Sequence, residues 1–469
     1  MPADTGGPLH GDGQPLDRVL TGWGRTAPTR AAVARPVRRD EVEAVLRSEP
    51  GRGAIARGLG RSYGDAAQCA GGVVIDLTGL DGIHHLDAVN GVVKVDAGIS
   101  LDALMRLLLP LGWFVPVTPG TRHVTVGGAL TADIHGKNHH VDGSFCDHVE
   151  RFTLITPTGT VDVSPEAEPD LFWATAGGMG LTGVVVDTTV RLRPVETTSV
   201  RVDTERARDL DDVLDRMGQG DHHYQYSVAW IDCLARGGSL GRSVLTRGHH
   251  ARLEELPDRA RHAPLAFDPK ASAGAPHWLP SGLLNRVSVR AFNALWFAKA
   301  PSLERDRILP LAAFFHPLDG IRNWNRLYGR RGLVQYQFAL PLGQEDVLGR
   351  VLAHLSAAQC PSFLAVLKRF GPANPGPLSF PIQGWTLALD APAGWAGLAP
   401  LLDGLDEMVA EAGGRVYLAK DSRLKPELVP VMYPRLDEWR RVQAKADPAG
   451  MLQSDLGRRL ALVQRDHIE

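Results

Sequence analysis

The fold assignment depends on residues 120–140, which read Gly-Thr-Arg-His-Val-Thr-Val-Gly-Gly-Ala-Leu-Thr-Ala-Asp-Ile-His-Gly-Lys-Asn-His-His. Paired glycines allow backbone N–H groups to approach an anionic ligand closely, and the threonine hydroxyls add further donors for a diphosphate. The histidine and lysine of the Ile-His-Gly-Lys cluster can move protons beside whatever is bound. A second glycine-rich loop lies upstream at residues 56–65, so the two segments together predict a bound dinucleotide.

Length and composition indicate an ordinary globular protein with two or three domains, because 469 residues exceed what one core usually holds. Hydrophobic residues make up 44% and charged residues 22%, and the formal net charge of -2 gives no reason to expect a nucleic-acid-binding face. The chain has only eight lysines beside 43 arginines. Each lysine in a candidate site is therefore of interest.

The cysteines and the N-terminal segment bear on the cellular compartment. The four cysteines are far apart and form no Cys-x-x-Cys pair, which favours a reducing environment: Cys69, Cys146, Cys233 and Cys360. Residues 1–33 lack the apolar core of a signal peptide, and the apolar run at 101–117 is interrupted by Arg106, Pro110 and Pro116. We therefore expect neither a signal peptide nor a transmembrane helix, and a cytoplasmic or peripheral membrane protein, with the periplasmic face left open.

Hydrophobic patterning predicts alternating short strands and helices. Apolar runs bounded by Gly or Asp predict strands in the first half at residues 54–55, 73–77, 92–95, 152–155, 161–163 and 184–192, and Ser100 is predicted to cap a helix. Further strands are predicted at residues 224–231, 333–340, 362–368, 386–390 and 415–419, and helices at 171–174, 210–217 and 395–412. The tail at residues 436–462 is predicted to be mostly helical. Residues 268–301 hold aromatic side chains without clean periodicity, which fits either ordinary core or a mobile apolar lid.

Three motif matches favour other classes of protein but fail a test of context. Gly178 to Gly183 spell G-x-G-x-x-G, but the predicted helix precedes the loop and the strand follows it, the reverse of a nicotinamide-binding unit. Residues 60–64 and 237–241 match G-x-S-x-G, but no amphipathic helix follows either one, as a serine hydrolase requires. The histidines of residues 135–140 have no carboxylate at a metal-binding spacing, so no metal is expected.

Seven blocks of sequence resemble the FAD-dependent oxidases of the vanillyl-alcohol-oxidase type (PCMH-type flavoproteins). The likeness is closer still to the decaprenylphosphoryl-β-D-ribose 2′-oxidases, the flavin half of a two-enzyme epimerase, and it runs from about Trp23 to Leu462. The blocks are residues 57–65, 118–140, 171–183, 316–319 (His-Pro-Leu-Asp), 335–338 (Gln-Tyr-Gln-Phe), 377–385 and 419–423 (Ala-Lys-Asp-Ser-Arg).

This resemblance implies an α+β fold with a two-part FAD-binding domain and an antiparallel-sheet substrate domain. The corresponding ranges are 1–197 for the FAD-binding domain and 198–413 for the substrate domain, with a mobile lid at about 268–331. Residues 414–469 are expected to return to the FAD domain. Many relatives attach FAD through a histidine of the first glycine-rich loop, but this loop reads Arg61-Ser62-Tyr63-Gly64, with tyrosine instead. We therefore expect non-covalent FAD.

The resemblance also implies roles for individual residues. The residues expected to contact FAD are Ala56, Arg57, Gly58, Leu59, Gly60, Arg61, Ser62, Tyr63, Gly64, Asp65, Ala66, Gly120, Thr125, Val126, Gly127, Gly128, Ala132, Asp133, Ile134, His135, Val185 and Tyr417. Those expected on the substrate side are Lys137, Trp230, Phe315, Gln335, Gln337, Ala388 and Lys420. Hydride would leave the ribose C2 for the flavin N5, and Lys420 is the first choice of base because burial can lower the pKa of a lysine. His135 is the second choice, and a purely structural pairing of Lys420 with Asp421 or a flavin carbonyl is the alternative.

The implied reaction oxidises the 2-hydroxyl of a polyprenyl-phosphate ribose, the first half of an epimerisation that supplies arabinose for cell-wall arabinan. It implies an NAD(P)H-dependent keto-reductase partner, quinone or oxygen as electron acceptor, and a peripheral membrane contact. Two other functions stay open, an oxidase of a soluble sugar alcohol or aldonolactone and a non-catalytic scaffold on the same fold. Relatives commonly carry a cysteine, the attachment point of nitroaromatic inhibitors, where this chain has Ala388. Only reversible inhibition is therefore expected.

Overall fold

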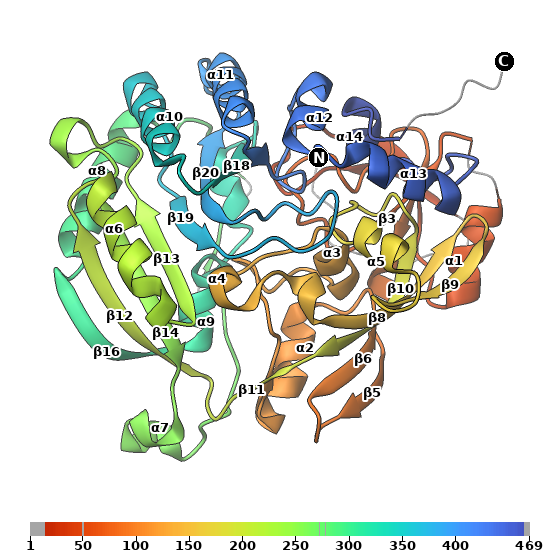
Figure 1. Cartoon of the computed structure of the whole chain (residues 1–469), viewed down its shortest axis with the longest axis horizontal. Coiled ribbons are helices and arrows are strands. Elements are labelled where there is room, and N and C mark those ends of the chain that lie inside the picture. The colour runs from red at the N-terminus through yellow and green to blue at the C-terminus, as the bar shows by residue number, and fades with distance from the viewer. Residues whose placement is uncertain (1–14, 49–50, 272, 277, 464–469) are drawn as a thin grey trace.

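A computed structural model describes residues 15–48, 51–271, 273–276 and 278–463 (Figure 1). The first 14 residues, which include part of the segment tested for a signal peptide, and the ends of the ranges predicted for the first and last domains lie outside the described residues. The fold is α+β, as predicted, with mixed helices and mostly antiparallel sheets. Within the described ranges, no helix is both long enough and apolar enough to cross a membrane.

The N-terminal part contains two larger sheets and one small sheet, in which β7 (Trp113–Phe114) pairs antiparallel with β11 (Arg193–Pro194). A four-stranded sheet in the order β1-β2-β4-β3 comprises β1 (Leu16–Leu20), β2 (Thr29–Ala34), β4 (Val73–Asp76) and β3 (Ala54–Arg57). A five-stranded antiparallel sheet in the order β5-β6-β10-β8-β9 comprises β5 (Ile83–Asp87), β6 (Val92–Asp96), β10 (Val184–Arg191), β8 (Val149–Thr156) and β9 (Gly159–Val163). All six strands predicted in this half are confirmed.

Short helices connect and cover the two larger sheets. They are α1 (Arg39–Arg47), α2 (Leu101–Leu108), α3 (Val126–Thr131), α4 (His139–Asp142) and α5 (Pro169–Thr175). The predicted cap of α2 is confirmed, because the Ser100 hydroxyl accepts a hydrogen bond from the Ala103 N–H at 3.1 Å. The Gly178–Gly183 loop lies between α5 and β10, so the order of helix and strand around it is the one read from the sequence.

The second part is built on one eight-stranded antiparallel sheet in the order β16-β12-β14-β13-β19-β20-β18-β21. Its strands are β12 (Ser199–Ala207), β13 (Tyr226–Ile231), β14 (Ser243–His250), β16 (Leu303–Pro310), β18 (Leu333–Pro341), β19 (Ala365–Phe370), β20 (Gly384–Pro392) and β21 (Arg415–Val416). Three helices lie along one side of it in Figure 1: α6 (Leu210–Gly220), α10 (Glu345–Ala358) and α11 (Leu398–Glu411).

Residues 268–301, for which the sequence pattern predicted no particular secondary structure, include the 14-residue helix α8 (Arg286–Lys299). The Asn285 side chain caps this helix by accepting hydrogen bonds from the N–H groups of Val287 and Ser288. Apolar side chains lie on several sides of the helix, so they produce no single buried stripe and no clear periodicity. The short helices α7 (Asp258–Arg261) and α9 (Leu311–Phe315) flank this region.

The C-terminal segment joins the two parts of the molecule. It starts with β21 on the edge of the large sheet and continues through α12 (Val429–Met432), α13 (Leu436–Ala446) and α14 (Asp455–Arg459). On α13 the Trp439 indole N–H donates to the carbonyl of Ala174 at 2.9 Å, and Leu452 forms a parallel bridge with Ala54 beside β3. The segment therefore contacts both the large sheet and the N-terminal part.

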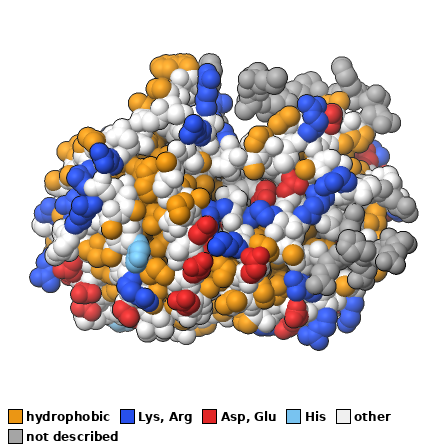
Figure 2. Space-filling view, turned by 90° about the horizontal axis from the view of Figure 1, so that it is seen from above, with side chains coloured by type: hydrophobic (Ala, Val, Ile, Leu, Met, Phe, Trp, Pro, Cys, Tyr) orange, Lys and Arg blue, Asp and Glu red, His pale blue; other side chains and the backbone are white. Residues whose placement is uncertain are grey.

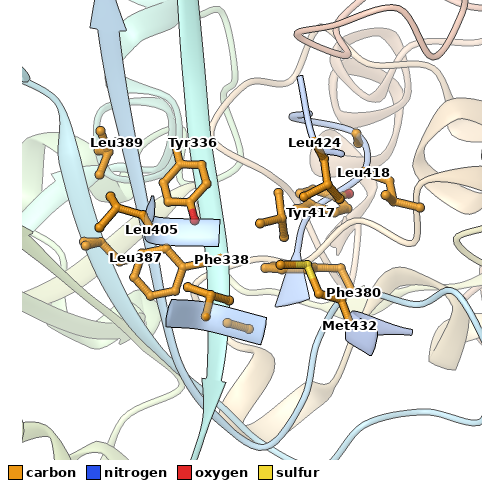
Figure 3. Close-up of a cluster of buried hydrophobic side chains, with 14 of the residues drawn as sticks. Tyr336, Phe338, Phe380, Leu387, Leu389, Leu405, Tyr417, Leu418, Leu424 and Met432 are labelled. Carbon is orange, nitrogen blue, oxygen red and sulfur yellow. The ribbon is translucent and has the colours of Figure 1, made fainter. Parts of the chain in front are cut away.

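A continuous apolar core lies where these pieces meet. Figure 3 shows Tyr336 and Phe338 of β18 and Leu387 and Leu389 of β20 on one side, with Leu405 of α11 beside them. On the other side are side chains from the C-terminal segment and from the loop before β20: Tyr417, Leu418, Leu424, Met432 and Phe380. Burial of this apolar surface holds the C-terminal segment against the sheet.

Charged side chains on the surface are mixed in sign. On the face drawn in Figure 2, Lys and Arg side chains alternate with Asp and Glu side chains and with apolar ones.

Candidate active site

A cavity of about 450 Å³ lies between the glycine-rich loops and the large sheet. Most of the residues predicted for the site line this cavity. From the predicted cofactor set these are Ala56, Arg57, Gly58, Leu59, Gly60, Arg61, Ser62, Tyr63, Ala66, Gly120, Thr125, Gly127, Gly128, Ala132, Ile134, His135, Val185 and Tyr417. From the predicted substrate set, Lys137, Trp230, Phe315, Gln335, Gln337, Ala388 and Lys420 all line it. The fold thus gathers segments from across the whole chain around one space.

The two glycine-rich loops approach each other too closely for side chains at their contact. A Cβ atom on Gly58 would lie 2.1 Å from the Thr125 hydroxyl oxygen, and a Cβ on Gly127 would lie 2.9 Å from the Ala97 Cβ. Gly60 has a φ of +62°, which favours glycine, and Gly120 has open space around it. At their glycines the loops therefore present backbone to the cavity, beside side chains such as those of Arg61 and Tyr63.

Four predicted residues do not line the cavity, and each lies behind its wall. Asp65 binds Arg459 of α14, and Gly64 lies so close to the Asp421 carbonyl that a Cβ could not fit. Val126 is fully buried in the apolar core. Asp133 is also fully buried and accepts hydrogen bonds from several donors: Ser144, the Cys146 N–H, Asn374 and Ser379. These residues fix the loops that carry the lining residues.

The lining of the cavity is cationic. It contains two arginines, three lysines and one histidine, and no aspartate or glutamate among the described residues: Arg57, Arg61, Lys137, Lys368, Lys420 and His135. Such a site favours an anionic ligand, because each bound negative charge offsets the cost of holding the arginine and lysine cations away from water.

Three of the eight lysines of the chain lie in this cavity, and burial lowers the pKa of each. The pKa falls to about 7 for Lys137 and for Lys368 and to about 8 for Lys420. Removal from water is the main cause, and the positive charge of the neighbouring lysine adds to it for Lys137 and Lys368. A neutral amine that can accept a proton is therefore available near neutral pH.

His135 is held as a neutral ring. Burial lowers its pKa well below the usual value, and the aromatic rings of Phe370, Phe380 and Tyr417 surround it at centroid distances of 4.9, 5.4 and 5.2 Å. The Gln337 amide nitrogen lies 2.8 Å from Nε2 and donates to it, so Nδ1 carries the ring proton. Nδ1 is buried and has no protein partner among the described residues, which leaves it as a free hydrogen-bond donor.

Lys420 lies against the first glycine-rich loop. Its Nζ is 4.1 Å from the centroid of the Tyr63 ring, a cation–π geometry. The Tyr63 hydroxyl accepts a hydrogen bond from the Gln335 amide at 3.1 Å. Asp421, which follows Lys420, is bound to Arg459 at 2.8 Å, so it is committed to another partner. The structure therefore gives no support to a pairing of Lys420 with Asp421.

Several further residues line the cavity without any motif in the sequence that predicts it. Lys368, Val228, Val366 and Leu364 come from or beside β13 and β19, and Trp23 and Trp324 from segments near the chain start and before β18. These positions carry no local motif, because pairing of distant strands brings them to the cavity. The one usable signal was the scarcity of lysine, which marks Lys368 as unusual on a predicted strand.

The helix α8 presents apolar side chains to solvent beside the cavity. Val287 is 70% exposed, Leu295 68%, Trp296 48% and Phe292 43%. Trp296 also lines the cavity, so this helix contributes both to the interior and to the surface. Its sequence contains basic residues, Arg286, Arg290 and Lys299, and no acidic residue. The aromatic residues of this region therefore form a surface patch and not an ordinary core.

The cavity fits FAD. Glycines of both loops line the cavity, so a diphosphate can approach their backbone N–H groups, and the lining has cations and, among the described residues, no carboxylate. The free Nδ1–H of His135 adds a buried donor of the kind that a flavin carbonyl or ring nitrogen accepts. The first loop offers tyrosine where a covalent attachment would need histidine.

Comparison with known proteins agrees with this geometry. The family profile of the FAD binding domain (FAD_binding_4) matches residues 30–164. A decaprenylphosphoryl-β-D-ribose oxidase of Mycolicibacterium smegmatis is 45% identical over 95% of this chain and 97% of its own length. An uncharacterized protein of Streptomyces coelicolor is 45% identical over 78% of this chain and all of its own length. An L-gulono-1,4-lactone dehydrogenase of Mycobacterium tuberculosis is 26% identical over 45% of this chain and 50% of its own length.

Proposed function

The chain belongs to the family of decaprenylphosphoryl-β-D-ribose oxidases, FAD-dependent oxidoreductases, and on that premise we propose that it oxidises the 2-hydroxyl of a polyprenylphosphoryl ribose to a ketone. The observation that supports this most is the cationic cavity with Lys420 held against the FAD loop beside Tyr63. The product would be the keto sugar from which arabinose for cell-wall arabinan is made.

The roles of the residues follow from their protonation. When bound, FAD supplies the acceptor for the hydride that leaves the sugar carbon. The neutral amine of Lys420 takes the hydroxyl proton, because its lowered pKa of about 8 leaves a useful fraction unprotonated near neutral pH. His135 suits a donor role instead, because its Nε2 already accepts from Gln337 and its Nδ1 carries the proton.

The remaining residues that line the cavity are suited to binding the phosphate and the sugar of the substrate. Lys137 donates to the Phe314 carbonyl and lies 4.2 Å from the Phe314 ring, close to Phe315, where it can attract the substrate's phosphate. Trp230 is fixed by its indole N–H, which donates to the Phe363 carbonyl at 3.0 Å. Gln335 and Gln337 point from β18 toward the cavity and can bind sugar hydroxyls.

The apolar surface of α8 favours a lipid-linked substrate over a soluble sugar alcohol or aldonolactone. A soluble polyol needs no exposed tryptophan or leucine next to the site, whereas a polyprenyl chain does. We propose that α8 rests on an anionic membrane surface, with its basic residues near the headgroups. Charged substitutions Val287→Glu and Leu295→Glu should weaken binding to phosphatidylglycerol vesicles in a flotation assay. Val431→Glu is the matched control, since Val431 is 56% exposed on α12.

The reaction requires two further partners. The keto sugar must be reduced by an NAD(P)H-dependent keto-reductase to complete an epimerisation, and the electrons must pass from the reduced flavin to a quinone or to oxygen. Two assays would test these proposals: consumption of NAD(P)H when a keto-reductase is added to the product, and comparison of quinone with oxygen as reoxidants of the reduced enzyme.

The decisive experiment is anaerobic mixing of the purified holoenzyme with polyprenylphosphoryl ribose. Loss of the flavin absorbance, with formation of one keto sugar per flavin, supports the proposal. Bleaching by an aldonolactone or a sugar alcohol alone would favour the soluble-substrate oxidase. Retention of full flavin colour with all three substrates would favour a protein that kept the fold without turnover.

A further inference from the structure

A buried carboxylate lies directly behind the residues assigned to the chemistry. Asp390 on β20 is paired in register with Gln335 on β18, and it is 0% exposed. The Gln335 amide nitrogen donates both to the Asp390 carboxylate and to the Tyr63 hydroxyl. Asp390, Gln335 and Tyr63 therefore form a hydrogen-bonded chain that ends at the ring on which Lys420 rests.

Asp390 has unused capacity to interact with a positive charge. Its Oδ2 makes no well-aligned hydrogen bond among the described residues, and the Tyr328 hydroxyl that faces it acts as a donor that lowers the Asp390 pKa. The titratable groups that influence it come from three other elements of the fold: Gln335-bound Tyr63, the phenol of Tyr328 and the amine of Lys420. Of these groups, Lys420 alone can carry a positive charge.

The same pairing acts on Lys420 in return. Burial lowers the pKa of Lys420, just as it lowers the pKa of Lys368 on the neighbouring strand β19. The negative charge of Asp390 opposes this lowering at Lys420. Burial in turn raises the pKa of Asp390 to about 7. The two groups are therefore linked, and a change in one changes the protonation of the other.

We propose that Asp390 is a positioning residue of the oxidation, which fixes Gln335 against Tyr63 and sets the proton affinity of Lys420. This inference rests on the proposed function, in which Lys420 accepts the hydroxyl proton. In that step the O–H bond breaks and its proton goes to the Lys420 amine, and bound FAD would supply the acceptor for the hydride of the C–H bond. The Asp390 carboxylate then compensates the ammonium that has formed in the buried site.

The first test is the pH dependence of flavin reduction in Asp390→Asn. In the wild-type enzyme the rate rises as pH increases through the Lys420 pKa, because only the neutral amine accepts a proton. Without the negative charge of Asp390 the pKa of Lys420 falls. The acidic limb of the curve of reduction rate against pH should therefore move to lower pH by about one unit. The plateau rate should fall by roughly tenfold, since a weaker base accepts the proton less readily.

Asp406→Asn is the matched control. Asp406 is another buried carboxylate with a pKa raised to about 7, but it binds Arg423 at 2.7 Å and does not line the cavity. Loss of the Asp406 carboxylate should lower the stability of the protein and leave the acidic limb of the rate-against-pH curve unchanged. An Asp390→Asn enzyme that binds FAD and keeps the wild-type limb would overturn the inference.

The second test needs no turnover. With only eight lysines, selective ¹³C labelling of the lysine side chains gives a spectrum in which Lys420 can be assigned by comparison with Lys420→Arg. In the FAD-loaded protein, Asp390→Asn should lower the titration midpoint of the Lys420 signal by about one pH unit. An unchanged titration midpoint of Lys420 would refute the coupling between Asp390 and Lys420. If wild-type flavin is not bleached by the substrate but the midpoint still moves, the proposed function fails and the pairing stands.

Discussion

Lys420 and Lys425 lie five residues apart and have opposite surroundings. Lys425 is half exposed and pairs with Glu407 at 3.5 Å, whereas Lys420 lies over Tyr63 inside the cavity. Lys420→Met should therefore lower the rate of substrate-driven flavin reduction by about 10²- to 10⁴-fold, as expected for loss of a general base. Lys425→Met should leave that rate unchanged. Stopped-flow absorbance of the two FAD-loaded variants measures both, and near-normal reduction in Lys420→Met would assign the base elsewhere.

Ala388 determines how nitroaromatic inhibitors can act on this protein. It lies on β20 opposite Gln337 and lines the cavity, where many relatives are expected to have a cysteine. All four cysteines are buried, and none lines the cavity among the described residues. A nitrobenzothiazinone with reduced flavin should therefore leave the intact mass unchanged, whereas Ala388→Cys should gain the mass of one adduct. A covalent adduct on the unaltered chain would contradict this prediction.

At the scale of helices and strands, sequence patterns predicted the elements that are marked by a short apolar run. They did not predict features that depend on the packing or pairing of distant segments. Short apolar runs predicted β10 and β8 because their side chains are buried on both faces. The helix α8 was missed because its apolar side chains face solvent and show no buried stripe. Lys368 and Asp390 were missed as site residues because pairing of β19, β20 and β18 places them, and no local spacing records that pairing.

The helix α14 secures the loops around the site through one side chain. Arg459 binds Asp65 behind the first glycine-rich loop and Asp421 beside Lys420, each at 2.8 Å. Arg459→Ala leaves both carboxylates buried without their cation, so the free energy of unfolding should fall by about 3–5 kcal/mol. Arg47→Ala removes an exposed pair with Glu43 and should cost no more than about 0.5 kcal/mol. Urea unfolding of both variants tests this, and equal losses would show that Arg459 is no more important than a surface arginine.

At the scale of the whole molecule, the cavity is a junction of every part of the chain. The N-terminal loops, the large sheet and the segment after β21 each supply lining residues, while the apolar core of Figure 3 joins the same parts behind it. A ligand in this junction contacts all of them at once and binds only the folded protein. Occupancy of the cavity should therefore raise the stability of the assembled molecule by mass action.

This arrangement predicts how FAD is held and what its removal does. The first loop carries Tyr63, whose hydroxyl is bound to Gln335 and whose pKa burial raises well above the usual value, so it is a poor nucleophile for a covalent link. Acid precipitation should release all the flavin absorbance into the supernatant, and a yellow pellet would mean a covalent bond. The FAD-free protein should unfold at a lower Tm, by several degrees, and regain the original value as FAD is added back. Differential scanning calorimetry against FAD concentration measures the recovery, and a Tm independent of FAD would place the cofactor outside this junction.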